Sequence, residues 1–257
     1  MKKQHLDTHD RRIMIYDKLI KNELIKINDL AKEFNVSSMT IRRDLSIFEK
    51  QDLITTTYGG AYLNHGKSIE ADFSLKTSQM VGAKLKIAKY AASLITENDT
   101  IIIDCGSTAL QLAKQLPNIK MTVVTNSWPI INYLGNNKKI KLILACGTYN
   151  SISGGTLDSK TISFFNTINA DKVFMSSQAL DFERGLTVPD PIDAEVKKSM
   201  FNAGRLRYLM IDHSKIDHTY LAKHADVVDF DLVIVDDQLS DKAHQQFKTM
   251  NAKLKVV

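Results

Sequence analysis

The first fifty residues place their apolar positions at the spacing of helices rather than strands. Between Asp10 and Leu24 apolar side chains recur every three or four positions with charges between them, which predicts a first helix. A second, short helix is expected over Asn28–Phe34, where Asn28 can cap the exposed amides, and a third over Ser37–Lys50, capped by Ser37. The predicted apolar face of the first helix consists of Ile13, Tyr16, Leu19 and Ile20.

The third predicted helix has one apolar stripe, made of Ile41, Leu45 and Phe48. If this stripe faces the first two helices, the opposite face points outward. Hydroxyls at a helix start can hold phosphates, and arginine can reach a guanine edge, so this face suits a DNA major groove. A solvated face of a three-helix bundle is the alternative, but two short helices joined by a three-residue turn favour DNA binding. The outward residues are Ser38, Met39, Arg42, Arg43 and Ser46.

Residues 53–62 are rich in β-branched and aromatic side chains around Gly59-Gly60, which predicts a small hairpin beside the helices. The run Val36–Leu45, followed by Gly59-Gly60-Ala61, resembles the winged helix-turn-helix of the DeoR family of bacterial transcription regulators. In that family basic residues and a histidine usually precede the Gly-Gly pair, whereas Thr55–Tyr58 stand here. The DNA contacts that pattern and resemblance imply are Ser37, Ser38, Met39, Thr40, Arg42, Arg43, Ser46 and Tyr58.

Residues 63–80 lack a strong period and are expected to be a partly ordered connector. The pattern beyond them alternates helices, the first over Lys84–Ile95, with short apolar strands. Such alternation predicts an α/β domain with a largely parallel sheet, whose ligands lie past the carboxyl ends of the strands. We therefore expect a DNA-binding domain at 1–62, a linker at 63–80 and an effector-sensing α/β domain at 81–257. The expected strands are Thr100–Asp104, Met121–Thr125, Lys141–Ala145, Lys172–Met175, Tyr208–Asp212 and Leu232–Asp236.

Polar residues follow several of these strands. The first strand leads into a glycine and two hydroxyls at a helix start, a combination that forms an anion cradle because amides and hydroxyls point the same way. Later strand ends add amide, hydroxyl and lysine groups to the same edge of the sheet. Together they favour a small ligand that is both phosphorylated and hydroxylated. The candidate residues are Asp104, Gly106, Ser107, Thr108, Asn126, Ser127, Gly147, Tyr149 and Lys215.

The second domain also resembles the DeoR-family sensor domain, which is similar to the ribose-5-phosphate isomerase fold. The resemblance implies a regulator of a sugar operon, usually a repressor, that a phosphosugar releases from DNA; it adds Glu195 and Lys197 to the effector-binding candidates. Two stretches depart from the family pattern: Cys146-Gly147 stands for its usual Gly-Gly, and Ser176–Ala179 for its usual Gly-x-Asp-Gly. The matching stretches are Asp104–Thr108, Val124–Ser127, Gly185–Asp190, Glu195–Lys197 and Asp212–Lys215.

The competing hypothesis is a phosphosugar isomerase with an added DNA-binding arm. Aldose–ketose isomerisation needs a base near the reacting carbons, and isomerases of the similar fold have aspartates in the loop that follows the strand at 172–175. Here that loop has no acid before Asp181, while Glu195 and Lys215 can simply bind a ligand. We therefore expect a binding protein without catalytic residues. His213 has no second histidine at metal-ligand spacing, so neither a metal nor a cofactor is expected.

Composition and charge restrict the class of protein and its expected compartment. The 257 residues are 44% hydrophobic and 25% charged, as in ordinary globular proteins, without a signal-peptide pattern or an apolar run near the roughly 18 residues of a membrane span. Two cysteines, Cys105 and Cys146, fit a reducing cytoplasm. The net charge of +5 is spread over both halves of the chain.

Because one recognition helix reads few base pairs, a homo-oligomer on paired half-sites is expected. The single tryptophan, Trp128, is expected either on the ligand edge or packed beneath the loop that forms it, with Pro129 beginning a helix.

Overall fold

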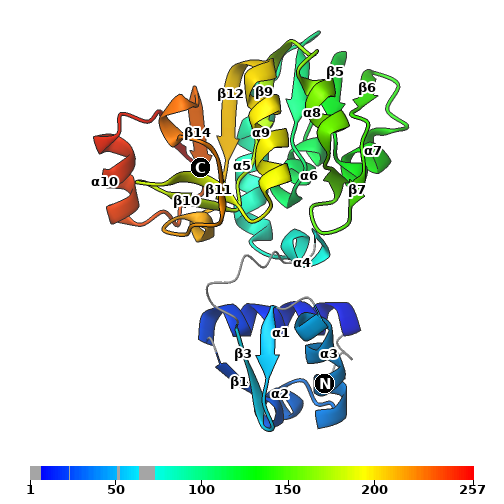
Figure 1. Ribbon diagram of the computed structural model, residues 1–257, viewed down its shortest axis with the longest axis vertical. Helices are drawn as coiled ribbons and strands as arrows, with labels where there is room; N and C mark the ends of the chain where they lie inside the picture. Colours follow the sequence, from blue (N-terminus) through cyan, green and yellow to red (C-terminus); the bar gives the residue numbers. More distant parts are fainter. Residues whose placement is uncertain (1–6, 23, 51–52, 64–72) are drawn as a thin grey trace. The chain divides into compact units, whose positions relative to one another are not determined.

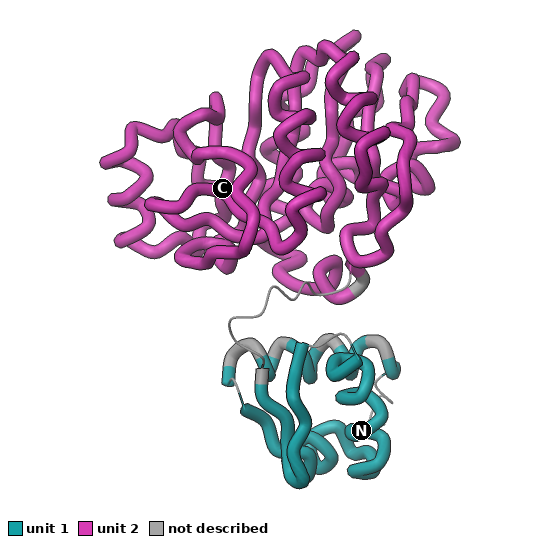
Figure 2. The backbone as a smooth tube through the Cα atoms, viewed as in Figure 1, with its two compact units in different colours: residues 1–71 teal, residues 72–257 magenta. Residues whose placement is uncertain are grey.

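The computed structural model describes residues 7–22, 24–50, 53–63 and 73–257. Its chain separates into two compact units, residues 1–71 and 72–257 (Figure 2). The expected connector at 63–80 is divided between them, because Phe73–Ser78 form helix α4 of the second unit while 64–72 lie outside the described residues.

The described residues of the first unit form three helices and a small antiparallel sheet of order β1-β3-β2 (Figure 1). Leu24, which the helical pattern assigned to the end of the first helix, instead begins a strand that pairs with Tyr62. That pairing partner lies far along the chain, so a local pattern gives no sign of it. The elements are α1 Thr8–Asn22, β1 Leu24–Lys26, α2 Ile27–Glu33, α3 Ser38–Lys50, β2 Ile54–Thr56 and β3 Gly60–Leu63.

The helix-turn-helix follows the predicted spacing. The stripe of α3 is buried as predicted, with at most 1% of Ile41, Leu45 and Phe48 exposed. Tyr16 and Leu19 of α1 are buried with it, whereas the side chains of Ile13 and Ile20 lie outside the described ones.

The two predicted helix caps have different outcomes. Ser37 caps α3 as predicted, since its Oγ accepts the Thr40 amide at 3.1 Å. Asn28 as the cap of α2 was wrong: the chain enters α2 directly from β1, so Lys26 is the cap residue and Asn28 lies inside the first turn. The Asn28 carboxamide instead accepts a hydrogen bond from Ser38 Oγ at 3.4 Å.

The second unit is built on a seven-stranded sheet of order β15-β14-β12-β9-β4-β5-β6, in which every neighbouring pair is parallel. This confirms the α/β class and the predicted strands. Its helices are α4 Phe73–Ser78, α5 Val81–Ser93, α6 Ser107–Lys114, α7 Trp128–Leu134, α8 Ser159–Phe165, α9 Pro191–Ala203 and α10 Asp241–Thr249, with 3₁₀ turns η1 His213–Lys215 and η2 Val227–Asp229. The strands of the large sheet are β4 Thr100–Ile103, β5 Met121–Thr125, β6 Ile140–Leu144, β9 Ala170–Met175, β12 Gly204–Met210, β14 Leu232–Val235 and β15 Leu254–Val256.

Side chains of each strand alternate between two buried cores, because successive residues of a strand point to opposite faces. Ile101 and Ile103 pack with α5, α6 and α7, whereas Ile102 packs on the other face with α8, α9 and α10. Figure 1 shows the sheet between these two layers of helices. Within the described ranges, no helix is long and apolar enough to cross a membrane.

Two small antiparallel sheets were not predicted, and both bring loops to the carboxyl edge of the large sheet. One joins β7 Tyr149–Asn150 to β8 Gly155–Thr156. The other has the order β10-β11-β13. The strands of this second sheet are short, and the pair β11–β13 joins segments that are far apart in the chain. Local patterns in the sequence therefore do not indicate the sheet. Its strands are β10 Ala179–Asp181, β11 Gly185–Val188 and β13 Ala222–Ala225.

Candidate functional site

Helix α3 presents an exposed face whose charge is positive. Arg42 and Arg43 are exposed, and 59% of Met39 is exposed. The acid of the same run, Asp44, points inward instead: it is 1% exposed and accepts hydrogen bonds from Arg11 Nε at 2.7 Å and Arg12 Nε at 2.8 Å. The carboxylate thereby joins α3 to α1 and is removed from the face that would meet phosphates.

The turn of the hairpin is tied to this face by a hydrogen bond from Arg42. Arg42 Nη2 donates to the Tyr58 carbonyl at 2.7 Å, at the turn between β2 and β3. The Tyr58 side chain itself is 97% exposed. Arg42 therefore positions the hairpin beside α3 as well as adding charge. The hydroxyls predicted as DNA contacts are partly engaged locally, because Ser37 bonds Thr40 and Ser46 donates to the Arg43 carbonyl.

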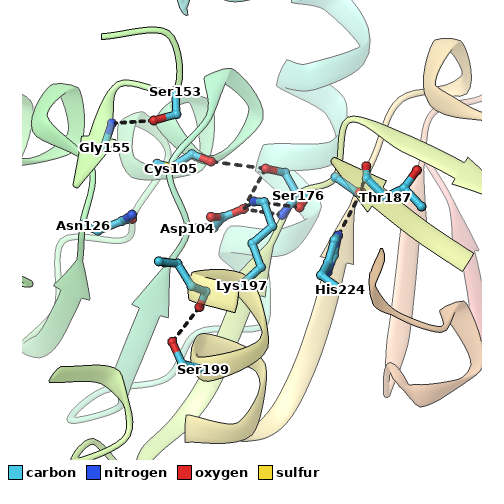
Figure 3. A network of polar contacts seen from close by, with 12 residues as sticks. Asp104, Cys105, Asn126, Ser153, Gly155, Ser176, Thr187, Lys197, Ser199 and His224 are labelled. Carbon is cyan, nitrogen blue, oxygen red and sulfur yellow. Dashed lines mark hydrogen bonds and ion pairs between the residues drawn. The ribbon is translucent and has the colours of Figure 1, made fainter. Parts of the chain in front are cut away.

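In the second unit, the Asp104 carboxylate after β4 is the centre of a buried polar cluster (Figure 3). Lys197 Nζ donates to Asp104 Oδ2 at 2.6 Å, and the Ser176 amide and hydroxyl donate to the same oxygen at 3.0 and 2.9 Å. The Lys197 and Asp104 side chains are 4% and 0% exposed. Asp104 Oδ1 is buried without a hydrogen-bond partner among the described residues. A ligand hydroxyl can satisfy this oxygen.

The charges of this cluster set the protonation states of its members. Burial by itself would lower the pKa of Lys197, but the Asp104 and Asp193 carboxylates raise it above the ordinary lysine value. Lys197 is therefore an ammonium at neutral pH. Burial, with the same two carboxylates, raises the pKa of Cys105, so its thiol stays protonated. The cluster can bind polar groups but holds no thiolate nucleophile at Cys105.

Helix α6 begins beside the cluster, and no side chain caps the backbone amides of its first turn. Gly106 is its cap residue. Gly106 has φ +133°, and a Cβ there would lie 3.0 Å from Ser176 Oγ, so a larger residue would be both strained and crowded. Ser107 and Thr108, 8% and 6% exposed, supply hydroxyls at the same end. Open amides, hydroxyls and the helix dipole suit an anion.

A cavity of about 330 Å³ lies next to this edge, at the end of β5 and β6. Asn126 Nδ2 donates to the Thr156 carbonyl at 2.9 Å, while Asn126 Oδ1 and Ser127 Oγ are buried without hydrogen-bond partners among the described residues. As predicted, Pro129 lies at the start of a helix, and Trp128 lies at the edge, 57% exposed. The cavity is lined by Asn126, Trp128, Ile131, Leu144, Tyr149 and Thr156.

Three of the predicted effector residues belong neither to the hydrogen bonds of Asp104, nor to the start of α6, nor to the lining of the cavity. Gly147, at φ +151°, packs against α8, where a Cβ would lie 2.1 Å from Thr161 Oγ1. The Glu195 side chain is 54% exposed and pairs with Lys198 at 2.8 Å on the surface of α9. Lys215 is half-buried in η1, which follows β12. Strand β12 lies next to β9, the strand that precedes Ser176. Thus Lys197, not Lys215, is the lysine that contacts Asp104.

Three residues of the site, Ser176, Ser177 and His224, were not among the predicted effector contacts, although Ser176–Ala179 had been noted as a departure from the family pattern. Ser176 and Ser177 follow β9 directly, so the rule applied to the other strand ends could have found them. Ser177 Oγ lies 3.0 Å from His224 Nε2. His224 is 4% exposed, and burial, followed by the charges of Lys197 and Lys198, holds its pKa well below 6.5. Nothing in the sequence around His224 signals this contact.

Comparison with known proteins identifies the family from both units. The model of the DeoR-like helix-turn-helix domain matches residues 11–67, and that of the DeoR C-terminal sensor domain matches residues 79–237. The chain belongs to the DeoR family of transcriptional regulators. The predicted resemblance is thereby confirmed for the DNA-binding unit and for the sensor unit.

Relatives match over nearly the full length. The lactose phosphotransferase system repressor of Lactococcus lactis is 31% identical over 94% of this chain and 96% of its own. The HTH-type transcriptional regulator GolR of Listeria innocua is 31% identical over 96% and 98%. Among solved structures, ribose 5-phosphate isomerase A of Methanocaldococcus jannaschii is 17% identical, and the match covers 52% of this chain and 53% of the isomerase chain. The TM-score is 0.37, so this similarity supports no conclusion about the reaction or the ligand.

Proposed function

We propose that this DeoR-family member is a repressor of genes for sugar uptake or breakdown, released from operator DNA when a phosphorylated sugar binds its second unit. The observation that carries the proposal is the start of α6, where uncapped amides and two hydroxyls adjoin the Asp104–Lys197 cluster. The printed name of the Lactococcus lactis relative, a sugar-system repressor, supports the same function.

The phosphate and the hydroxyls of the ligand would bind different groups. The open amides of α6, with Ser107 and Thr108, would hold the phosphate. The buried oxygens without partners, Asp104 Oδ1 and Asn126 Oδ1, can accept hydrogen bonds from sugar hydroxyls. Burial makes these bonds selective, since an analogue that lacks a hydroxyl leaves a buried oxygen unpaired.

DNA binding would use α3 and the hairpin of the first unit. Arg43 and Met39 would enter the major groove, and Tyr58 at the hairpin turn would meet the backbone. Because one such unit covers few base pairs, two copies would bind paired half-sites. Lys197 is held protonated by Asp104, which suits binding rather than proton abstraction and supports a sensor over an isomerase.

The test measures operator affinity and its response to ligand in the full chain. DNA selected from a random pool by the chain itself serves as operator, and pentose and hexose phosphates serve as ligands. Fluorescence of Trp128, the only tryptophan, reports binding in the second unit. We expect one phosphosugar to shift this emission saturably and to weaken operator binding. A chain that selects no sequence, or whose operator binding no sugar phosphate changes, would contradict the proposal.

Replacement of Arg43 by Ala isolates the recognition helix from the hairpin, because Arg42 also holds the Tyr58 carbonyl. The Arg43→Ala change should cost about 1–3 kcal/mol of operator binding if the guanidinium contacts a base. Lys50→Ala is the matched control, since Lys50 is an exposed cation at the other end of α3. Equal affinities of the two variants in anisotropy titrations at about 150 mM salt would remove α3 from the interface.

A further inference from the structure

The cavity beside the ends of β5 and β6 has uncharged walls. It measures about 330 Å³, close to the lower end of the range for small-molecule sites, so it suits a ligand of one ring. The described residues that line it include no Asp, Glu, His, Lys or Arg. Because burial of a charge without a partner is costly, the ligand, or the part of it that enters, is uncharged. The lining comes from the segment between β5 and α7, from α7 itself, and from β6, β7 and β8.

Two aromatic side chains, Trp128 and Tyr149, form part of this wall. They are 57% and 52% exposed, and neither ring stacks on another aromatic ring of the described residues. Their backbones are nevertheless fixed. The Trp128 amide donates to the Gly154 carbonyl at 2.9 Å, and Tyr149 pairs with Thr156 across β7 and β8. Two half-exposed rings on anchored backbones offer a flat apolar surface to a ligand.

One residue of the lining has an unused hydrogen-bond acceptor. Asn126 is 1% exposed, and its Nδ2 donates to the Thr156 carbonyl at 2.9 Å. This bond fixes the carboxamide, whereas Oδ1 is buried without a partner among the described residues. A buried acceptor without a partner costs free energy, so a ligand that donates a hydrogen bond here is favoured over a purely apolar one. The cavity therefore suits a molecule that combines an apolar face with a hydroxyl.

A sugar ring has both properties. The C–H groups on one face of a pyranose or furanose form an apolar surface that packs on aromatic rings, while the hydroxyls lie around its rim. A phosphate group does not fit this cavity, because it would lose its hydration without gaining a cation. An aromatic or aliphatic ligand without a donor would cover the two rings but leave Asn126 Oδ1 unpaired.

The cavity adjoins the start of α6, where the function proposed above places the phosphate. Gly155 contacts a residue on each side, since a Cβ there would lie 2.9 Å from Cys105 Cβ and 3.0 Å from Asn126 Nδ2 (Figure 3). Cys105 directly precedes Gly106, the cap residue of α6. A ring in the cavity can therefore have two sources: the phosphosugar whose phosphate binds at α6, or a separate uncharged sugar.

We propose that this cavity binds a sugar ring, with its apolar face on Trp128 and Tyr149 and one hydroxyl donating to Asn126 Oδ1. The inference rests on the sugar-responsive function proposed above and specifies a cyclic sugar as the class of ligand. Selectivity between sugars then depends on the two aromatic rings, because an open-chain sugar presents no continuous apolar face to them.

The test is calorimetry on the full chain. The probes are glucose 6-phosphate, fructose 6-phosphate and ribose 5-phosphate, and the same three sugars without phosphate. Trp128→Ala and Tyr149→Ala should each weaken binding by about tenfold or more, because a ring that packs on the sugar is lost. Tyr149→Phe keeps the ring and should bind within about threefold of wild type. Tyr133→Ala is the matched control, since Tyr133 is also 52% exposed, lies on α7 and is outside the lining; it should stay within about twofold.

The pattern of losses identifies the source of the ring. Weaker binding of a phosphorylated probe in both Ala variants would place the ring of the effector in the cavity. Weaker binding of an uncharged sugar, with phosphosugar binding unchanged, would support a separate sugar site. Equal affinities of wild type and both Ala variants for every probe that binds would overturn the inference and leave the proposed function intact. A wild-type chain that binds none of these probes would also overturn it, whereas the proposed function fails only if no sugar phosphate changes operator binding.

Discussion

The buried pair of Lys197 and Asp104 brings two charges together at 2.6 Å where water is excluded. Such a pair contributes little over an apolar one, because desolvation offsets the attraction, but loss of one partner leaves a buried charge uncompensated. The Ser176 amide and hydroxyl complete the coordination of the carboxylate. At this scale the site is therefore sensitive to single charge changes.

Neutralisation of Asp104 should destabilise the second unit strongly. Asp104→Asn leaves the Lys197 ammonium buried without its carboxylate and should cost about 3–5 kcal/mol of unfolding free energy. Glu195→Gln, two residues before Lys197, breaks only an exposed pair with Lys198 and should cost less than about 1 kcal/mol. Urea unfolding measures both. Costs that do not differ would show that Asp104 and Lys197 are not held as a buried pair.

His224 should make the fold sensitive to acid. Burial, followed by Lys197 and Lys198, holds its folded pKa well below the unfolded value of 6.5. The unfolded chain therefore binds the proton first, so the contribution is present above pH 6.5 and is lost as pH falls below it. Relative to His224→Gln, wild type should lose up to about 2 kcal/mol between pH 7 and pH 5. The exposed His244→Gln is the control, and a wild-type profile parallel to that of His224→Gln would contradict the prediction.

At the scale of elements, the first unit depends on how closely the strands β1 and β3 of its sheet approach each other. Gly60 begins β3 opposite β1, and a Cβ there would lie 2.3 Å from the Ile25 carbonyl oxygen. Gly59, its neighbour in the same turn, has no heavy atom within 4 Å of the corresponding position. Of the two glycines, only Gly60 lies where the close approach of β3 to β1 leaves no room for a side chain.

Replacement of the two glycines by Ala should separate these roles. Gly60→Ala pushes β3 away from β1 and should destabilise the first unit by about 1–3 kcal/mol, with weaker operator binding because the hairpin moves from α3. Gly59→Ala should change stability by less than about 1 kcal/mol. Hydrogen exchange of the α3 amides in the full chain measures the loss in the first unit. Equal protection in both variants would mean that the β1–β3 approach is looser than described.

For the whole molecule, ligand and DNA must influence each other equally. If the phosphosugar weakens operator binding by about 5–150-fold, operator DNA must weaken phosphosugar binding by the same factor. Calorimetric titration of the ligand with and without saturating operator measures the second factor, and anisotropy measures the first. Unequal factors under one set of conditions would indicate a further coupled equilibrium, such as a change in the number of assembled copies.

Much of the architecture was predictable because its signals are local. The stripe of Ile41, Leu45 and Phe48 follows from helical spacing, and the core strands, such as Ile101–Ile103, from short apolar runs. The elements that escaped prediction depend on distant partners: β1 exists because β3 pairs with it, and β13 because β11 does. Helix α4 has too few residues to show a period and gains its position by packing on α6 and Gly154.

The family was recognised from the resemblance of its motifs. The division into a helix-turn-helix and a parallel α/β unit, and the polar strand ends, could be predicted from the residue pattern alone. These last two features follow from side-chain spacings within a few residues. Which polar groups contact one another depends on how the elements pack. Lys197 rather than Lys215 pairs with Asp104 because α9 packs on β9, beside β4, and this brings together residues 93 positions apart in the chain. Glu195, on the same helix, points to solvent because successive helical side chains face different directions.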